Sequence, residues 1–361
     1  MPPIKVAIVG VGNCACSLLQ CVLSSKLKDE IDGIRTTVGK YKVGDIEIVA
    51  AFDVDVRKTG RCLGRAAQSA PNCTPVALHE GMDTYGPQVL SGPILDGVSA
   101  HMRDYSDKNR SFWISRNHES VNVVEQLRSS GAEILINYLP VGSQKATEFY
   151  AECCLEVGLA FLNCIPIFIA SNPEWERRFI EKNLPLIGDD MKSQFGASIL
   201  SQVLQEAAES RGVKVDYHIQ RNVGGNTDFL NMESKDRVTS KKISKENVIK
   251  NVCSGNQTFV HAGPSEYISV YGDTKIANIH MKMRGVMGSP IELIAQLTVV
   301  DSPNSAGVVV DAIRYLKIAL DRGLKGSLRG PSSFTQKSPP SPLSLSESMK
   351  ECDVFLGATQ T

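Results

Sequence analysis

The residues whose types and spacing suit chemistry lie closest together between Gln220 and Lys245, in the run QRNVGGNTDFLNMESKDRVTSKKISK. Its first part combines amides, glycines and a carboxylate in a turn-forming sequence: Asn222, Gly224, Gly225, Asn226 and Asp228. Lys241 and Lys245 follow at i,i+4 spacing, so in a helix they would share one face. Two ammonium groups there repel by roughly a few tenths of a kcal/mol unless an anion lies between them. The run predicts an anion-binding site, with a solvated basic loop as the alternative.

A glycine-rich turn near the start of the chain predicts a second site. Ile4 to Val9 is a short apolar run that predicts a buried strand, and a helical pattern begins soon afterwards. The sequence GVGNCA between them matches G-x-G-x-x-A. Such glycines let the backbone approach a pyrophosphate, and the helix N-terminus directs amides at it. The alternative is a purely structural strand-helix turn. The predicted dinucleotide contacts are Gly10, Gly12, Asn13 and Cys14.

The end of the next strand indicates which dinucleotide binds. Ile46 to Phe52 predicts a strand that closes with Asp53, whose carboxylate suits a ribose 2′-hydroxyl and would repel a 2′-phosphate. NAD is therefore favoured as the cofactor, although the nearby cations Arg57 and Lys58 leave NADP open. The long separation from the glycine turn requires an insertion at Glu30 to Gly44.

Alternating helices and strands predict that the same sheet continues after residue 120. The expected elements are helix Val121–Ser129, strand Glu133–Asn137, helix Gln144–Val157, strand Ala160–Asn163, helix Pro173–Glu181 and strand Pro185–Gly188. Ligands bind at the carboxyl ends of strands in such sheets. This adds Asn137, Leu139 and Pro140 to the predicted cofactor contacts. The fold class is therefore α/β, with a Rossmann-type doubly wound parallel sheet.

The sequence GDDMKSQ, from Gly188 to Gln194, predicts a phosphate cradle. We expect this run to end a strand and to begin a helix that continues to about Ser210. A helix N-terminus with Ser193 and Gln194 beside paired carboxylates would bind a phosphate and hydroxyl groups. Ordinary N-capping by Asp190 explains part of the same pattern.

After Gly212 the pattern changes to strands separated by long loops, which predicts an inserted α+β unit with its own sheet. Its expected strands are Tyr217–Asn222, His280–Val286 and Ile291–Val300. Asp301 to Ser305 then cap a helix at Ala306–Arg322. The Pro/Ser-rich run Gly323–Ser348 follows, and we expect Lys337 within it to be exposed. Ser69 to His118 has weak periodicity and stays unassigned, either as a lid or as a surface excursion.

The composition limits the classes of function. The 361 residues are 42% hydrophobic, and the formal net charge is zero, so we expect neither a nucleic-acid partner nor a membrane partner. The N-terminal residues lack the pattern of a signal peptide. Ten cysteines without a C-x-x-C pair favour free thiols in a reducing compartment, so we expect a cytoplasmic protein.

Taken together, motifs along nearly the whole chain resemble the myo-inositol-1-phosphate synthases, particularly the shorter bacterial and archaeal type. These motifs are GVGNCA, AFDVD, NYLPVGS, GDDMKSQ, NVGGNTDFLN, SKKISK, GDTK and DSPNSAGV. The resemblance implies NAD-dependent cyclisation of D-glucose 6-phosphate to 1D-myo-inositol 3-phosphate by a homotetramer. The implied steps are transient oxidation at carbon 5, enolisation, aldol closure and re-reduction. It further implies a discontinuous NAD-binding domain, residues 1–190 and 300–361, interrupted by a catalytic and oligomerisation domain at 191–299.

The resemblance also implies the site residues. The matching catalytic positions are Lys241, Lys245, Lys275, Lys337, Asp190, Asp228 and Asp301. The implied substrate contacts are Ser193, Gln194, Asn222 and Asn226, and Asp190 is also an implied cofactor contact. In our assignment Lys241 and Lys275 act at the oxygen of carbon 5, Lys337 acts at that of carbon 1, and Lys245 lies near the phosphate. These roles can exchange within the set. A monovalent or divalent cation is left open as a second cofactor, with no ligands assigned.

Three alternatives stay open at this point. A related synthase could cyclise another sugar phosphate for a specialised pathway. A thiol-dependent aldehyde dehydrogenase would need one of Cys153, Cys154 and Cys164 as nucleophile and a histidine as base. A noncatalytic NAD-binding protein would have lost the site, which the four lysines argue against.

Overall fold

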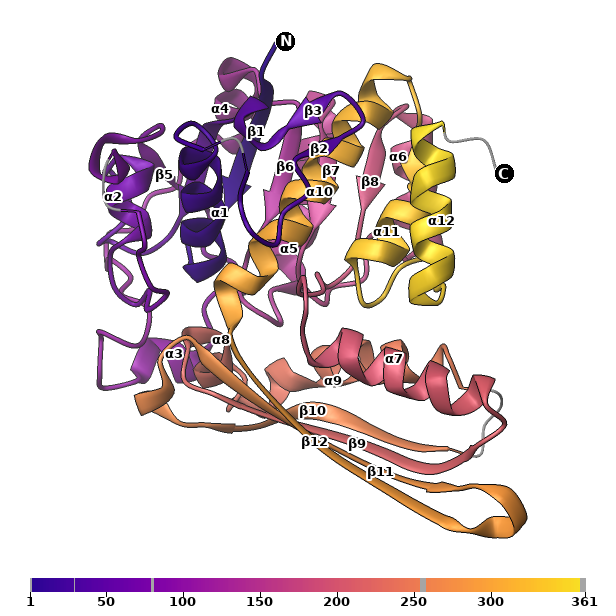
Figure 1. Ribbon diagram of the computed structural model, residues 1–361. Coiled ribbons are helices and arrows are strands. Elements are labelled where there is room, and N and C mark those ends of the chain that lie inside the picture. Colours follow the sequence, from indigo (N-terminus) through magenta and orange to yellow (C-terminus); the bar gives the residue numbers. More distant parts are fainter. Residues whose placement is uncertain (1, 29, 79–80, 254–257, 358–361) are drawn as a thin grey trace.

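The computed structural model describes residues 2–28, 30–78, 81–253 and 258–357, and it contains two main sheets, one above the other in Figure 1. The larger sheet has the order β13-β8-β7-β6-β1-β4-β5, and all its strand pairs are parallel. Its strands are β1 Ile4–Val9, β4 Ile46–Asp53, β5 Val89–Ser91, β6 Ile134–Asn137, β7 Ala160–Asn163, β8 Pro185–Ile187 and β13 Gly326–Ser327. The strand order reverses at β1, which is the switch point where Rossmann-type sheets bind dinucleotides. The expected α/β fold is confirmed.

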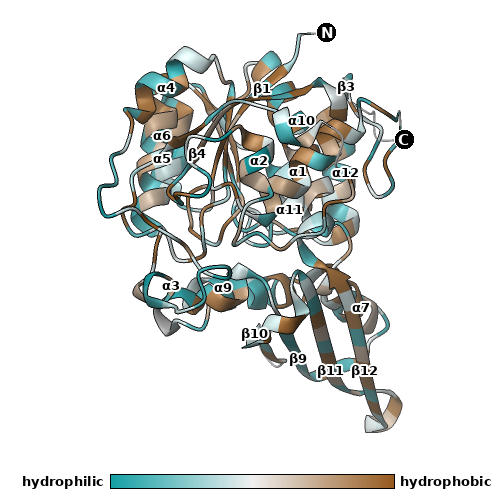
Figure 2. Ribbon diagram, turned by 90° about the vertical axis from the view of Figure 1, so that its left-hand side faces the viewer, coloured by the Kyte–Doolittle hydropathy of each residue, from teal (hydrophilic) through white to brown (hydrophobic). Residues whose placement is uncertain are grey.

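Helices cover both faces of this sheet, which explains why its strands are apolar on both sides. Helices α1 Asn13–Ser24 and α10 Asp301–Asp321 pack on one face. The other face is covered by α4 Val123–Ser130, α5 Gln144–Val157 and α6 Pro173–Glu181. Figure 2 shows the hydrophobic strands enclosed between these helical layers.

The smaller sheet is mixed, with the order β10-β9-β11-β12. Its strands are β9 Lys214–Gly224, β10 Phe259–Tyr267, β11 Thr274–Arg284 and β12 Pro290–Val300. Helices α7 Ala197–Ser210 and α9 Lys235–Lys250 cover the face that is turned toward the larger sheet (Figure 1). The buried positions of β11 alternate, with Ala277, Ile279, Met281 and Met283 facing these helices. The opposite face points away from the body of the molecule (Figure 2).

The remaining described elements are short connections and a C-terminal layer. The helices are α2 Leu63–Ala67, α3 Ala100–Asp104, α8 Thr227–Asn231, α11 Arg329–Thr335 and α12 Leu345–Leu356. The expected insertion after α1 contains the hairpin β2 Thr37–Val38 and β3 Tyr41–Lys42. The buried Arg314 guanidinium of α10 holds this insertion by donating to the carbonyl oxygens of Arg35 and Thr36.

Two expectations about helices were wrong. No helix begins at Gly188–Gln194, because Met191 forms a β-bridge with Gln336, and α7 begins only after the extended residue Gly196. Asp190 is therefore not a helix N-cap. Asp301 to Ser305 do not cap the next helix, because α10 already begins at Asp301 and these residues form its start. The Pro/Ser-rich run after Gly323, to which we assigned no elements, contains β13, α11 and the start of α12.

The expectation that Lys337 is exposed was also wrong. Its side chain is only 11% accessible, because residues 335–338 pair with residues 189–192. The unassigned run Ser69–His118 supplies β5, the edge strand of the larger sheet, and α3. Among the described residues, no helix is both long enough and apolar enough to cross a membrane.

Candidate active site

A continuous cavity extends from the glycine turn after β1 to the first residues of α10 and the near ends of β9 and β11. It brings together residues that lie far apart in the sequence. The predicted site residues that line it are Gly10, Gly12, Asn13, Cys14, Asp53, Leu139, Pro140, Ser193, Asn222, Asn226, Asp228, Lys241, Lys245, Lys275, Asp301 and Lys337. Asp190, Asn137 and Gln194 lie outside its lining.

The glycine turn forms one end of the cavity. Gly10 has a φ of +89°, and a Cβ there would lie 2.5 Å from the carbonyl oxygen of Tyr138, so only glycine fits. At Gly12 a Cβ would meet open space, which leaves the backbone accessible from the cavity. Gly12 is also the N-cap of α1, and no side chain caps that helix. The free amides at the start of α1 can therefore receive an anion.

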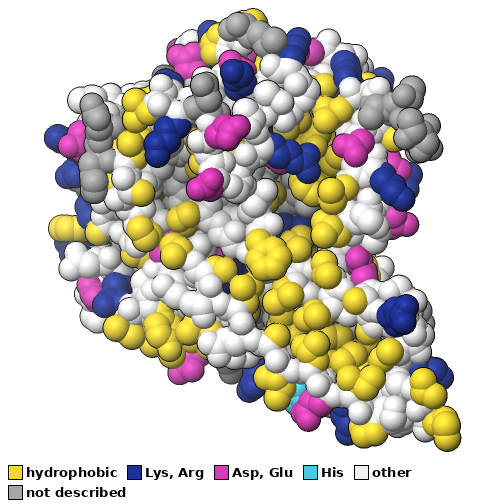
Figure 3. Space-filling model, in the orientation of Figure 1, with side chains coloured by type: hydrophobic (Ala, Val, Ile, Leu, Met, Phe, Trp, Pro, Cys, Tyr) yellow, Lys and Arg dark blue, Asp and Glu magenta, His cyan; other side chains and the backbone are white. Residues whose placement is uncertain are grey.

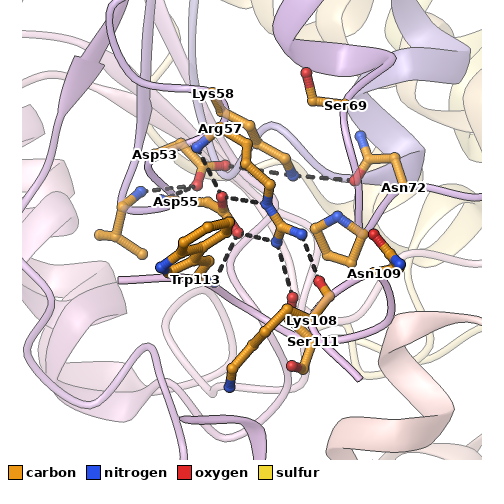
Figure 4. Close-up of polar contacts among 12 residues, drawn as sticks. Asp53, Asp55, Arg57, Lys58, Ser69, Asn72, Lys108, Asn109, Ser111 and Trp113 are labelled. Atoms are coloured by element: carbon orange, nitrogen blue, oxygen red, sulfur yellow. Dashed lines mark hydrogen bonds and ion pairs between the residues drawn. The ribbon is translucent and has the colours of Figure 1, made fainter. Parts of the chain in front are cut away.

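Asp53 lies at the end of β4, and Figure 4 shows its surroundings. Its Oδ2 accepts from the amide of Val11 at 2.7 Å, and its Oδ1 accepts from the amides of Val54 at 2.7 Å and Asp55 at 2.9 Å. These bonds fix the carboxylate at the edge of the glycine turn. Oδ1 therefore accepts two hydrogen bonds, and Oδ2 keeps a lone pair for a further donor.

The two nearby cations are engaged with the chain itself (Figure 4). Arg57 donates through Nε to Asp55 Oδ1 at 2.8 Å and through Nη2 to the Ser111 carbonyl oxygen at 2.8 Å. Lys58 is buried and donates to the carbonyl oxygen of Val11 at 2.7 Å and to Asn72 Oδ1 at 3.0 Å. Lys58 Nζ also forms an ion pair with Asp53, at 3.9 Å from its Oδ2.

Buried Asp190 organises the other end of the site. Its Oδ1 accepts from the Nζ atoms of Lys241 and Lys337, both at 3.1 Å, and its Oδ2 accepts from Ser244 Oγ at 2.6 Å. Lys337 also donates to the carbonyl oxygen of Met191 at 2.5 Å. One carboxylate thus holds lysines from α9 and from the C-terminal segment, which explains why Asp190 lies behind the cavity rather than in its lining.

The remaining two lysines complete a cationic wall. Lys275, from the start of β11, forms an ion pair with Asp301 at the start of α10. Lys245 lies one turn after Lys241 on α9 and is buried. Because α9 is a helix, the i,i+4 spacing does place Lys241 and Lys245 on one face of it.

The two lysines that share the Asp190 carboxylate have different pKa values. Burial alone would raise the pKa of Asp190, but Lys241 and Lys337 outweigh it and hold that pKa far below its usual range. Burial acts to lower the pKa of Lys241, yet Asp190 and the carboxylates around it hold it above its usual range. For Lys337, burial prevails over Asp190 and lowers the pKa to about 8. Lys337 is therefore the member of the pair that releases a proton more readily.

The pKa of Lys245 is lowered as well. Burial is the main cause, and Lys241, Lys275 and Lys337 add to it, so the pKa of Lys245 falls well below its usual range. The wall thus combines a firmly charged lysine with two that can lose their protons.

The predicted substrate contacts differ in their positions relative to the cavity and in their hydrogen-bond partners. Asn222 and Asn226 line the cavity, but both amides bind the chain: Asn222 donates to the Gly263 carbonyl oxygen, and Asn226 donates to Asp273 Oδ1 and caps α8. Ser193 lines the cavity from the loop before α7. The backbone amide of Gln194 donates to the backbone carbonyl oxygen of Asn304 at 2.6 Å, which directs this residue toward α10.

Asn137, a predicted cofactor contact, and Asp189, the neighbour of Asp190, serve the scaffold instead of the cavity. Asn137 is fully buried, donates to Thr147 and Asn163, and accepts from the amide of Leu139, so it shapes the loop that lines the cavity. Asp189 does not act together with Asp190. Its carboxylate accepts from the amides of Ile169, Ala170 and Ser171.

Three residues that the sequence reasoning did not select belong to this site. Ser244 bonds Asp190, and Asp273 accepts from Asn226 and from Ser302 Oγ at 2.9 Å. Lys192 lines the cavity with its amine almost fully buried. All three lie inside motifs already recognised, SKKISK, GDTK and GDDMKSQ, so their neighbours were the available signal.

The thiols that the aldehyde dehydrogenase alternative requires are poorly suited to act as nucleophiles. All ten cysteines are free. Burial raises the pKa of Cys14 and of Cys153 to about 12, and it raises those of Cys154 and Cys164 well above the usual range. No described histidine lines the cavity, so no histidine base stands beside Cys164. Within the described ranges there is also no group of three or more His, Cys, Asp or Glu side chains suited to hold a metal ion.

Comparisons with known proteins agree with this geometry. Residues 196–302 match the family model described as myo-inositol-1-phosphate synthase. An inositol-3-phosphate synthase of Corynebacterium glutamicum is 42% identical over 364 residues, 98% of each chain. The inositol-3-phosphate synthase of Mycobacterium tuberculosis is 42% identical over 346 residues, 94% of this chain and 92% of that one. The crystal structure of a myo-inositol-1-phosphate synthase-related protein from Thermotoga maritima has a TM-score of 0.82 at 23% identity, covering 99% of this chain and 100% of that one. This last likeness concerns the fold alone.

The parallel sheet, the glycine turn at its switch point and the charged cavity define an enzyme of the Rossmann-type α/β class. The identities over nearly the full length narrow this class. The chain belongs to the inositol-3-phosphate synthase family.

Proposed function

We propose that the protein converts D-glucose 6-phosphate to 1D-myo-inositol 3-phosphate with NAD bound along the glycine turn. The observation that best supports this is the shared cavity: Lys241, Lys245, Lys275 and Lys337 line the same space as Gly12. A sugar phosphate held against the lysines would therefore lie next to the dinucleotide.

The residues present fit NAD better than NADP. The uncapped start of α1 suits the pyrophosphate, and Asp53 at the end of β4 suits the ribose hydroxyls. A 2′-phosphate would meet the Asp53 carboxylate, while Arg57 is already bound to Asp55. When bound, NAD would supply a hydride acceptor and donor for carbon 5 of the sugar.

The chain's own residues would stabilise the charged oxygens and exchange the protons. Ring closure requires a carbanion at carbon 6, and a ketone at carbon 5 acidifies the proton there. We assign Lys241 and Lys275 to the oxygen of carbon 5, Lys337 to that of carbon 1 and Lys245 to the phosphate. An ammonium group 4 Å from an oxyanion contributes about 4 kcal/mol at an effective dielectric constant near 20. The lowered pKa values of Lys337 and Lys245 would let these amines exchange protons more readily than ordinary lysines.

The proposed mechanism is tested with glucose 6-phosphate deuterated at carbon 5. We expect inositol phosphate that retains the deuterium, catalytic amounts of NAD to suffice, and no steady rise of absorbance from NADH. Washout of the label into added unlabelled NADH would contradict the internal redox cycle. Release of one NADH per product would instead support an aldehyde dehydrogenase.

The substrate itself is tested by comparing glucose 6-phosphate with fructose 6-phosphate at equal concentrations. A higher kcat/KM for fructose 6-phosphate would favour a synthase that cyclises another sugar phosphate. We further propose that residues 1–190 and 300–361 form the NAD-binding domain and that 191–299 form the catalytic and oligomerisation domain. The start of α10 at Asp301 and the sheet formed by β9 to β12 support these boundaries.

A further inference from the structure

A second, much smaller cavity lies beside the lysine wall. It is lined by α7, α9 and the C-terminal segment, with Gln202, Ser333 and Gln336 among its residues. Lys192 and Lys337 line both this cavity and the main one. We call this space the back cavity. Its volume of about 10 Å³ lies at the lower limit of what a cavity needs to hold one water molecule.

Two buried amide oxygens of the back cavity have no partner among the described residues. Gln202 donates through Nε2 to Glu206 Oε1 at 2.9 Å and to the Leu343 carbonyl oxygen at 3.3 Å, which fixes its orientation and leaves Oε1 unbonded. Gln336 donates through Nε2 to Thr335 Oγ1 at 3.1 Å, and its Oε1 is likewise unbonded. Both residues are at most 2% exposed. Buried acceptors of this kind are normally satisfied, often by water.

Lys192 also lines this space and carries a donor group. Its Nζ donates to the carbonyl oxygen of Ser333 at 2.7 Å, which uses one of the three hydrogens of an ammonium group. No carboxylate of the described residues forms an ion pair with it, in contrast to Lys241, Lys275 and Lys337. A water molecule in the back cavity would supply the missing solvation.

We propose that the back cavity binds one water molecule, which donates to the amide oxygens of Gln202 and Gln336 and accepts from Lys192. Held in this way, Lys192 is a positioning residue that fixes Lys337 and adjusts its charge. The backbone supports the link, because the Lys192 amide donates to the Thr335 carbonyl oxygen at 2.8 Å, and the Lys337 amide donates to that of Asp190 at 2.7 Å. The catalytic importance of this arrangement rests on the proposed function.

The charges around the two amines agree with this role. Burial is the main cause that lowers the pKa of Lys192 to about 8, and the Lys337 ammonium adds to it. The other groups acting on Lys192 are Glu206 of α7 and Cys352 of α12. Those around Lys337 are Asp190, Lys241, Lys275, Lys245 and Cys164. Since neighbouring ammonium groups disfavour each other, a charged Lys192 makes Lys337 lose its proton at lower pH.

The test measures the protonation of Lys337 directly, without turnover. The rate of competitive acetylation of Lys337 is followed from pH 6 to pH 11 by mass spectrometry. In Lys192→Met the midpoint should rise by about 0.5–1 pH unit, because one neighbouring positive charge is gone. In Gln202→Leu the water loses an acceptor and its space, so Lys192 loses its proton more readily and the midpoint should rise in the same direction. The matched control Lys182→Met, an exposed lysine at the end of α6, should leave it unchanged.

An unchanged midpoint in Lys192→Met would overturn the proposal. A shift in Lys192→Met but not in Gln202→Leu would overturn the water site, as would a high-resolution crystal structure without density in the back cavity. If Lys192→Met does not fold, Gln202→Leu and the crystal structure still decide the question. Turnover is assayed separately: a wild-type protein inactive on glucose 6-phosphate would refute the proposed function while leaving the labelling result intact.

Discussion

At the scale of residues, the site depends on one anion that is shared by two cations. Asp190 binds Lys241 and Lys337 at equal distances, and this sharing was not visible from the sequence. The sequence indicated which lysines to examine, through the motifs around them. It could not indicate that residues 335–338 pair with residues 189–192, because that pairing joins segments nearly 150 residues apart. For the same reason Lys337 was wrongly expected to be exposed.

Adjacent lysines on α9 provide a matched pair for testing this arrangement. Lys241 bonds Asp190, whereas Lys242 is about half exposed and lies 3.9 Å from Glu246. We expect Lys241→Met to lower kcat by about 10²–10³-fold, the usual effect of removing one stabilising donor from an oxyanion. Lys242→Met should stay within about twofold, as is usual for surface substitutions. Initial rates with glucose 6-phosphate measure both, and circular dichroism checks folding. More than a tenth of wild-type activity in Lys241→Met would remove Lys241 from the catalytic set.

At the scale of elements, the sequence predicted the larger sheet better than the segments that complete the site. Strands β1, β6 and β7 are short apolar runs bounded by turns, and their assignments are confirmed to within one residue at each end. The start of α7 was misplaced because GDDMKSQ has the composition of a helix N-terminus, whereas its backbone pairs with a distant segment. Helices α11 and α12 were missed because Pro and Ser dominate the local sequence.

The contact between β9 and α7 makes a prediction about acid stability. His218 of β9 is fully buried, and its Nδ1 lies 3.0 Å from Gln205 Oε1 of α7. Burial lowers its pKa from 6.5 to about 4. Between these values the unfolded chain binds a proton that the folded chain does not, so stability falls as the pH drops from 6.5 toward 4. The loss attributable to His218 is at most about 3 kcal/mol.

Urea unfolding at pH 7 and at pH 4.5 measures this effect. His218→Gln, which keeps a donor for Gln205, should lose less stability on acidification than the wild type. The same substitution at His280 of β11, which lies beside Glu292 on the open face of the sheet, provides the control. Equal acid sensitivity of His218→Gln and the wild type would show that other groups set the acid limit.

At the scale of the whole molecule, no described residue covers one side of the smaller sheet. Its last strand, β12, has no neighbour on its outer edge among the described residues, and Ile294 there is 76% exposed. Figure 3 shows hydrophobic side chains gathered over this part of the molecule. Long apolar edge strands associate unless they are protected. We therefore expect a homo-oligomer, a tetramer by the family resemblance, with this sheet in the interface.

Light scattering of the purified protein at micromolar concentration tests the expected assembly. The wild type should have about four times the mass of one chain. Ile294→Lys places a charge on the uncovered face and should give smaller species, while the exposed Leu27→Lys, after α1, should not. A monomeric wild type would contradict this expectation.

The pairing of residues 335–338 with 189–192 also has a consequence for the time at which activity arises. During synthesis, the glycine turn, α1 and most of the larger sheet leave the ribosome well before Lys337. Asp190 then has neither Lys241 nor Lys337 as a partner until α9 and the C-terminal segment follow. The glycine turn is thus synthesised early, but the cationic wall is complete only near the end of translation. A ribosome stalled before residue 337 would display a chain without the Lys337 ammonium and its bond to Asp190.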